Sequence, residues 1–239
     1  MALPRIGILG GMGPAATILL QQRLLDAVQA TKDADHIPLL IDMNPQVPSR
    51  IDYLIHGCGE NPGPVLARMA KGLQDAPVDA LAMPCCTAHH FAGHIEAAVS
   101  VPFLNMITLT AQRVANAVSP GAAIGILASP ATENVGLFRD ALTPVGLKTV
   151  YPKAAPPMLA AIEEIKSTGP GSDAISAVQD AVLELAEKGV EGFILGCSEF
   201  SMISPSLTSD LPIFDAIDVL TDAITNFWFE RMQRGAGTV

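Results

Sequence analysis

Short apolar runs alternate with longer segments of helical periodicity along the whole chain. The apolar runs predict strands at residues 5–9, 39–41, 78–83 and close to 103, and again at 123–127, 149–150 and 193–195. The periodic segments predict helices at residues 14–28, 64–74, 132–142, 173–188 and 216–233. Continuously apolar strands that alternate with helices are typical of parallel sheets covered on both faces. The pattern therefore predicts an α/β fold.

Three apolar segments of the first half recur in the second half in the same order. Residues 6–10 (IGILG) resemble residues 124–128 (IGILA), at an offset of 118. Residues 78–85 resemble 190–197 at an offset of 112, and residues 101–104 resemble 211–214 at an offset of 110. A single match of this kind arises easily between apolar strands, but three in order indicate a duplicated unit. We infer two pseudo-symmetric parallel-sheet α/β domains.

The duplication also sets the predicted domain boundaries. The first domain comprises residues 1–104 together with residues 216–239, because the last helix is expected to cross back and pack on the first half. The second domain comprises residues 105–215. A ligand site is expected in the cleft between the two.

Cys85 and Cys197 occupy equivalent positions in the two halves, each just after an apolar run. In open parallel sheets, ligands bind beyond the carboxyl ends of the strands, and both thiols are predicted to lie there. Two thiols presented by two similar halves can reach one small ligand from opposite sides. This arrangement suits the removal of a proton from one face of a carbon and its return to the other.

The composition limits the classes of function. The chain has 239 residues, of which 49% are hydrophobic and 16% charged, so a large core is expected. The net charge of −10 argues against nucleic acid as a partner, because binding to phosphates needs a basic face. No run of about 18 apolar residues and no signal peptide is seen, which predicts a cytoplasmic protein away from membranes. The cysteines are then expected to be reduced.

A glycine-rich loop, residues 10–16 (GGMGPAA), follows the first strand and opens a helix. With Asp42 it loosely fits a dinucleotide-binding fingerprint. The second half, however, replaces the glycines with residues 129–132 (SPAT), and a carboxylate suits such a loop as well as a pyrophosphate does. We therefore predict that Gly11 and Met12 contact a small anionic substrate and that no cofactor is bound.

The segment around Cys85 allows three interpretations. Cys85, Cys86, His89 and His90 could form a zinc cluster, but adjacent cysteines rarely chelate one tetrahedral metal. Cys85 and His89, four residues apart, could form a nucleophile–base dyad. A local structural hydrogen bond is the role we expect for His89, with no metal site. Cys58 has no partner signal and is expected to be incidental.

Several segments together resemble one family of enzymes. Residues 7–17 (GILGGMGPAAT) are similar to the opening of the aspartate/glutamate racemases, which work without pyridoxal phosphate. Residues 84–89 (PCCTAH) resemble the family's Pro-Cys-Asn-Thr-Ala-His segment, and residues 196–199 (GCSE) resemble its Gly-Cys-Thr-Glu segment. Residues 48–50 (PSR) align with its Pro-Asp-Arg loop, and Lys166 with its substrate lysine. The resemblance spans nearly the whole chain.

The resemblance implies a role for each matched residue. Cys85 and Cys197 would be the acid and base thiols, with no cofactor. Arg50 and Lys166 would hold a side-chain carboxylate of an acidic substrate. Three further matched residues, together with backbone amides, would hold the α-carboxylate: Cys86, Thr87 and Ser198. The family fold is two α/β domains with the site in the cleft, and a homodimer is implied.

Three positions bear on which substrate is expected. Glu199 stands where the related glutamate racemases carry a histidine, which indicates the aspartate branch. Cys86 replaces an asparagine of the family motif and donates hydrogen bonds only weakly. Ser49 replaces an acidic residue beside the substrate arginine. Two-cysteine isomerases of the maleate isomerase or hydantoin racemase type remain alternatives, as does a non-catalytic binding protein for an acidic amino acid.

Overall fold

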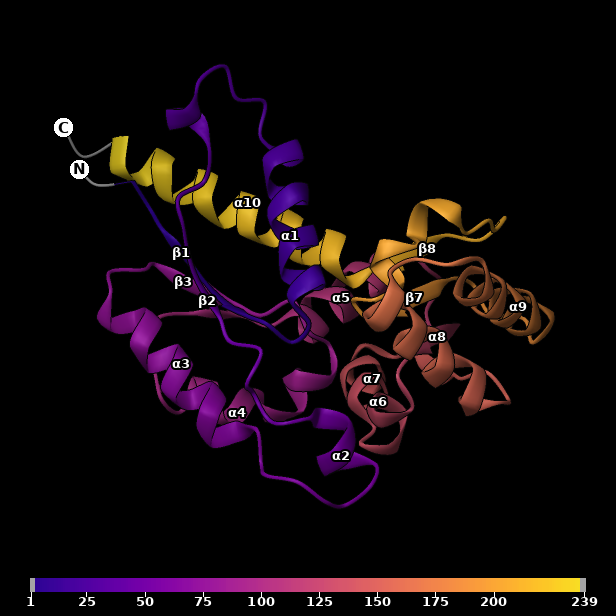
Figure 1. Ribbon diagram of the computed structural model, residues 1–239. Coiled ribbons are helices and arrows are strands. Elements are labelled where there is room, and N and C mark those ends of the chain that lie inside the picture. Colours follow the sequence, from indigo (N-terminus) through magenta and orange to yellow (C-terminus); the bar gives the residue numbers. More distant parts are fainter. Residues whose placement is uncertain (1–2, 237–239) are drawn as a thin grey trace.

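The framework of the molecule is a pair of four-stranded parallel sheets, seen in a computed structural model that describes residues 3–236 (Figure 1). The strand order is β2-β1-β3-β4 in the first sheet and β6-β5-β7-β8 in the second, so both halves have the same topology. This confirms the predicted α/β class with two similar units. The strands are β1 Ile6–Gly10, β2 Leu39–Met43, β3 Ala80–Ala82, β4 Phe103–Leu104, β5 Ala123–Ala128, β6 Lys148–Val150, β7 Phe193–Gly196 and β8 Ile213–Asp215.

Helices cover both faces of each sheet, as the uninterrupted apolar strands predict. All five residues of β1 are buried, and β1 pairs with β2 on one side and β3 on the other. The helices are α1 Pro14–Ala27, α2 Arg50–Leu54, α3 Gly63–Asp75, α4 Ala92–Glu96, α5 Met106–Ala115, α6 Pro130–Asn134, α7 Leu137–Leu142, α8 Ala155–Thr168, α9 Ser172–Glu187 and α10 Ala216–Ala236. Short 3₁₀ turns are η1 Asp33–Asp35, η2 Thr87–Phe91, η3 Thr143–Val145, η4 Phe200–Met202 and η5 Ser204–Ser206.

The two sheets share one hydrophobic core. Ile8 of β1 and Ile126 of β5 belong to the same buried cluster, which also takes in α1, α5, α7 and α10. A second cluster lies between the other face of the first sheet and α3, and a third between the other face of the second sheet and α8 with α9. The shared cluster joins the two units into one body. It thereby fixes the position of the first sheet relative to the second.

The helices α5 and α10 are equivalent, since each follows the last strand of its sheet. They pack against each other, and α10 also packs on α1 (Figure 1). The last helix therefore returns to the first unit, as the sequence predicts. The boundaries 1–104 with 216–239 and 105–215 stay a prediction, and residues 1–2 and 237–239 lie outside the described part of the chain.

The single helix predicted near residues 132–142 is wrong in detail. The segment forms two short helices, α6 and α7, that are separated at Gly136. Gly136 adopts a φ of 67°, a left-handed conformation that favours glycine and cannot continue a right-handed helix. The spacing of apolar residues continues across Gly136, so this spacing alone could not predict that the helix is interrupted there.

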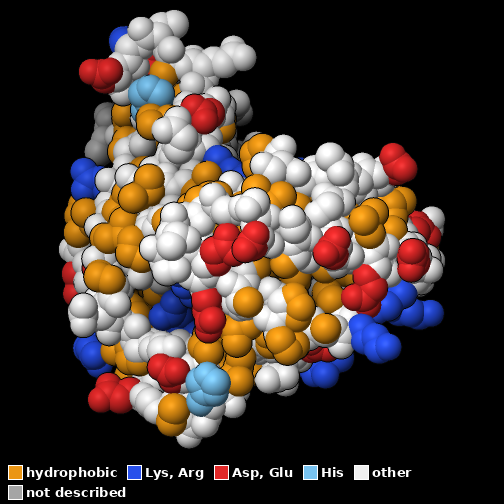
Figure 2. All heavy atoms as spheres, turned by 45° about the vertical axis from the view of Figure 1, so that its right-hand side comes forward, with side chains coloured by type: hydrophobic (Ala, Val, Ile, Leu, Met, Phe, Trp, Pro, Cys, Tyr) orange, Lys and Arg blue, Asp and Glu red, His pale blue; other side chains and the backbone are white. Residues whose placement is uncertain are grey.

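The surface agrees with the acidic composition. Acidic side chains are spread over the face of the molecule shown in Figure 2. Within residues 3–236, no helix is both long and apolar enough to cross a membrane.

Candidate active site

The carboxyl ends of β3 and β7 meet at one narrow cleft of about 350 Å³. Cys85 lies three residues beyond β3, and Cys197 directly follows β7. Both line the cleft, as their equivalent positions in the repeat predict. The other predicted residues that line it are Met12, Arg50, Cys86, Thr87, Lys166 and Ser198. Gly11 is the predicted residue that is absent from this lining.

The thiol of Cys197 is held by a carboxylate. Its Sγ donates a hydrogen bond of 3.0 Å to Oε2 of Glu199, and both side chains are buried. Burial raises the pKa of Cys197 well above its usual value, and the negative charge of Glu199 raises it further. Cys197 therefore keeps its proton at neutral pH.

Glu199 also holds Lys166 and Ser198. Lys166 Nζ lies 3.5 Å from Glu199 Oε1, and Ser198 Oγ donates to Glu199 Oε2 at 3.3 Å. The side chain of Lys166 is 44% exposed, whereas that of Glu199 is 8% exposed. The ammonium of Lys166 is thus paired with Glu199 at the exposed side of the cleft, and its contact with a substrate stays a prediction.

Within residues 3–236, Arg50 is the cation of the cleft that has no acidic partner. Ser49 caps α2 by accepting from Asp52 N, which places Arg50 in the first turn of that helix. The Arg50 guanidinium donates through Nη1 to the carbonyls of Val47 and Pro48, at 3.4 and 3.2 Å. Its Nε is buried and has no partner among the described residues. A buried donor left unpaired is costly, so this guanidinium fits a carboxylate ligand.

Cys86 and Thr87 follow Cys85 into the turn η2. Cys86 is 2% exposed and belongs to the shared core as well as to the wall of the cleft. Burial raises the pKa of Cys86 well above its usual value, with a further contribution from the charge of Cys85. Cys86 therefore stays a neutral thiol that offers a substrate only a weak hydrogen bond.

Gly11 serves the turn that presents Met12 to the cleft. Its φ is 92°, and a Cβ at this position would collide with the backbone of Asn44. Its N–H donates to Thr17 Oγ1 at 3.0 Å, so it is already occupied. The glycine permits a close approach between two backbone segments, and Met12 of the same loop lines the cleft.

His89 is a structural histidine. Its Nδ1 donates to the carbonyl of Cys85 at 2.8 Å, and its Nε2 accepts from Met106 N, at the start of α5, at 3.1 Å. Both ring nitrogens are therefore used by the backbone, which rules out the Cys85–His89 dyad. The described residues also contain no group of side chains suited to a metal ion. The predicted local hydrogen bond is confirmed.

The burial of His89 has a consequence for stability. Burial lowers the pKa of His89 to about 4, from 6.5. Below pH 6.5 the unfolded chain therefore takes up a proton that the folded chain refuses, and the free energy of unfolding falls. We expect a loss of about 2 kcal/mol from this group between pH 7 and pH 5.

Denaturant unfolding at the two pH values measures this loss. In His89→Asn, the fall between pH 7 and pH 5 should be smaller than in the wild type by about the same 2 kcal/mol. His90→Asn removes an exposed neighbour and should keep the full fall. An equal fall in all three proteins would contradict the assignment.

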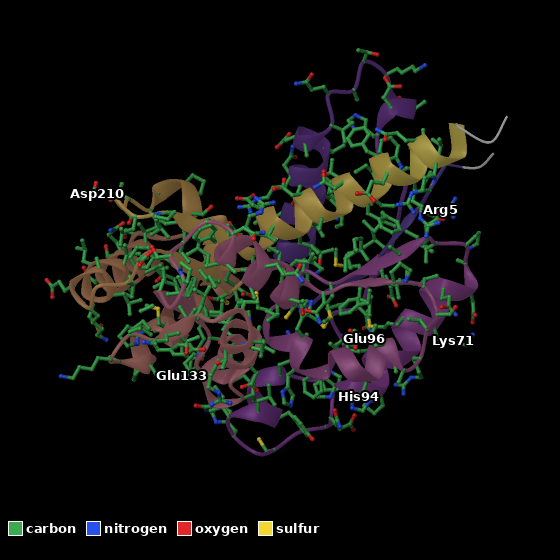
Figure 3. All side chains as sticks on the ribbon, turned by 180° about the vertical axis from the view of Figure 1, so that it is seen from behind. Arg5, Lys71, His94, Glu96, Glu133 and Asp210 are labelled. Atoms are coloured by element: carbon green, nitrogen blue, oxygen red, sulfur yellow. The ribbon has the colours of Figure 1, made fainter. Side chains whose placement is uncertain are left out.

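Other histidines and the fourth cysteine lie elsewhere. His90 and His94 line a separate, open cavity, and His94 is seen on α4 of the first unit in Figure 3. Cys58 is exposed, as expected of an incidental residue.

Four residues that were not predicted as substrate contacts also line the cleft: Ile51, Ser129, Ile162 and Glu199. Ser129 caps α6 and stands at the position equivalent to Gly11 under the offset of 118. The repeat therefore places Ser129 opposite a predicted substrate-binding position, and it could have been predicted on that ground. Ile51 and Ile162 are apolar residues of the helices α2 and α8, and nothing in the sequence distinguishes them from core residues.

Comparison with known proteins identifies a family and several similar enzymes. A family model described as Asp/Glu/hydantoin racemase matches residues 9–224. The broad-specificity amino-acid racemase RacX of Bacillus subtilis is 24% identical over 219 residues, which cover 88% of this chain and 92% of RacX.

Solved structures of racemases share the fold. The aspartate racemase of Picrophilus torridus has a TM-score of 0.79 at 26% identity, with 94% of each chain covered. An aspartate racemase homologue from Pyrococcus horikoshii has a TM-score of 0.74 at 19% identity, with 95% of this chain and 99% of that chain covered. Because the family model spans most of the sequence, this chain belongs to the Asp/Glu/hydantoin racemase family.

Proposed function

We propose that this chain is a cofactor-independent amino-acid racemase that acts on aspartate or a related acidic amino acid. One observation carries the proposal: Cys85 and Cys197, at equivalent strand ends of two similar units, line one small cleft. A carbon bound between two thiols can lose a proton to one and gain a proton from the other. That exchange inverts the configuration of an α-carbon.

The two thiols have different resting roles in this mechanism. Cys197 is the acid, because Glu199 and burial keep it protonated. Cys85 is the base that takes the α-proton. After one turnover, Cys85 carries a proton and Cys197 has given one up, so the opposite enantiomer reacts in the reverse sense. No oxidant or electron sink takes part in this proton exchange.

Arg50 supports an acidic substrate. Its buried, unpaired Nε can donate to a carboxylate, and its fixed Nη1 keeps the guanidinium in place. The hydroxyl of Thr87 lies on the same cleft and can donate to the second carboxylate, whereas the hydroxyl of Ser198 already donates to Glu199. Hydrogen bonds to the α-carboxylate stabilise the charge that develops when the α-proton leaves.

The relatives are consistent with this class of substrate. The similar structure from Picrophilus torridus is an aspartate racemase, and RacX is a broad-specificity amino-acid racemase. We further propose a homodimer, as the family resemblance of the sequence implies, and a location in the cytoplasm.

A panel of D- and L-amino acids, assayed by chiral chromatography in D₂O without added cofactor, tests the proposal. We expect both enantiomers of aspartate or of a related acidic amino acid to form, each with deuterium at the α-carbon. Deuterium is informative because a proton removed by a thiol exchanges with solvent.

Other outcomes separate the alternatives. Conversion of maleate without amino-acid turnover would indicate a maleate isomerase, and conversion of hydantoins would indicate a hydantoin racemase. Binding of aspartate without exchange of its α-hydrogen would indicate a binding protein and would contradict the proposal.

A further inference from the structure

Glu199 borders two separate spaces. One is the cleft that holds the two thiols, and the other is a depression between the first turn of α1, residues 13–16, and the end of α8. Pro14 and Ala15 line this depression and are exposed, so the depression is open to water. Water can therefore reach the carboxyl group of Glu199 from the depression while a substrate fills the cleft.

The two oxygens of Glu199 have different neighbours. Oε2 accepts hydrogen bonds from Cys197 Sγ at 3.0 Å and from Ser198 Oγ at 3.3 Å. Oε1 lies 3.5 Å from Lys166 Nζ, and it is 3.9 Å from the position that a Cβ at Gly13 would take. Lys166 and Gly13 both line the depression. Oε2 therefore faces the thiol, whereas Oε1 faces the depression.

The other thiol of the cleft lacks this connection. Within residues 3–236, the Sγ of Cys85 has no carboxylate partner, and Cys85 is not among the residues that line the depression. The hydrogen of Cys85 reaches water through the cleft, and a bound substrate fills that path.

We propose that Glu199 is a proton relay, which exchanges the hydrogen of Cys197 with water in the depression while a substrate fills the cleft. The inference rests on the proposed racemase activity and gives its two thiols different access to solvent. Lys166 stays in place throughout, and its ammonium stabilises the resting carboxylate of Glu199.

Each transfer in this relay is balanced. Cys197 takes an α-hydrogen as a proton, and the S–H bond then breaks as an O–H bond forms at Oε2 of Glu199. The neutral carboxyl group rotates, gives this proton to water in the depression and takes another proton from water. That second proton returns to the sulfur of Cys197. Since a thiol is a weaker acid than a carboxylic acid, the neutral carboxyl group is short-lived and the carboxylate is the resting form.

The relay predicts different hydrogen exchange for the two enantiomers of a substrate. An α-hydrogen that Cys197 removes is replaced by solvent hydrogen before it returns, so that enantiomer gains deuterium without inversion in D₂O. An α-hydrogen that Cys85 removes returns unexchanged, so the other enantiomer gains deuterium only when it inverts.

Initial rates with the full-length protein in D₂O measure this difference for the L- and D-forms of aspartate and glutamate. Chiral chromatography followed by mass spectrometry gives the ratio of exchange without inversion to inversion for each form. We expect this ratio to differ by about 10²-fold between the two enantiomers, the lower end of what a positioned acid–base group contributes.

Glu199→Gln keeps the shape of the side chain, but its amide does not take up the proton. For the enantiomer that exchanges, the ratio should fall by about 10²-fold, whereas inversion continues because Cys197 keeps its thiol. Glu184→Gln is the matched control. Glu184 pairs with Lys188 at 2.6 Å on α9 and lines neither space, so the ratio should not change.

Glu199→Ala with added formate tests the path through the depression. The open depression admits formate to the place of the missing carboxylate, so the ratio should rise again with formate and not with chloride. Thermal unfolding checks the fold of each variant. A formate series without effect would overturn the role of the depression.

Equal ratios for the two enantiomers in the wild type would overturn the relay and leave the racemase proposal standing. So would an unchanged ratio in Glu199→Gln. A loss of inversion in Glu199→Gln as large as the loss of exchange would also overturn it, because Glu199 would then be needed for the chemistry of Cys197 itself. Absence of deuterium from all four amino acids would instead contradict the racemase proposal.

Discussion

Cys85→Ala and Cys197→Ala should each lower kcat/KM for racemisation by roughly 10³-fold. Each variant keeps one thiol and so can serve only one face of the α-carbon. The two thiols act as a unit, and the double variant should therefore be little worse than either single variant. Neither change should unfold the protein, because alanine removes one sulfur atom from the wall of an existing cleft.

Cys58→Ala is the control for this experiment. Cys58 is exposed and is absent from the lining of the cleft, so its replacement should leave kcat/KM unchanged. The assay follows racemisation of both enantiomers of the best substrate, with thermal unfolding as a check on the fold. Racemisation that persists undiminished in either single cysteine variant would refute the two-thiol mechanism.

The strands and the cysteine pair could be predicted because both follow from local patterns. A parallel strand buried on both faces is a continuous apolar run, and β1, β5 and β7 all show one. Cys85 lies three residues beyond β3 and Cys197 directly follows β7, at equivalent places in the repeat. Each cysteine therefore lies at the carboxyl edge of its own sheet. The packing of the two sheets on their shared core brings these two edges together at the cleft.

The electrostatics of the site could not be predicted in the same way. Lys166 lies on α8, and its partner Glu199 lies beyond β7, 33 residues later. Only packing of these elements shows that Glu199 balances Lys166 and binds the thiol of Cys197. The family resemblance assigns Lys166 to the substrate, but it cannot show a pairing inside the protein.

Short helices were also missed for a physical reason. The helix α5 has ten residues and was not among the predicted elements, although Asn105 caps it by accepting from Ile107 N and Thr108 N. A segment of this length gives few turns of periodicity, so its existence depends on packing against α10 and the link from His89 to Met106.

Arg23 links the first unit to the loop that carries Cys197. Arg23, on α1, donates to Asp215 at the end of β8 at 2.9 Å and to the carbonyl of Ser201 at 2.8 Å. Ser201 in turn donates to Asp215 at 2.6 Å, and its N–H donates to the carbonyl of Cys197 at 3.3 Å. The side chains of Arg23 and Asp215 are only 16% and 4% exposed.

Arg23→Met should lower the free energy of unfolding by about 3 kcal/mol, because it leaves the carboxylate of Asp215 buried without its cation. Methionine retains most of the apolar stem of the side chain, so the loss reports the charge and its hydrogen bonds. Denaturant unfolding at pH 7 measures it. Arg113→Met is the matched control, since the ion pair of Arg113 with Asp222 is 46% and 50% exposed. That change should cost less than about 1 kcal/mol.

A double variant separates the buried charge from simple loss of contacts. If the cost of Arg23→Met arises from the unpaired carboxylate, then adding Asp215→Asn should recover part of it, because the neutral amide no longer needs a cation. If instead the cost arises from lost contacts alone, the second change should add to the first. A loss in Arg23→Met as small as that in Arg113→Met would show that the buried pair does not hold the Cys197 loop in place.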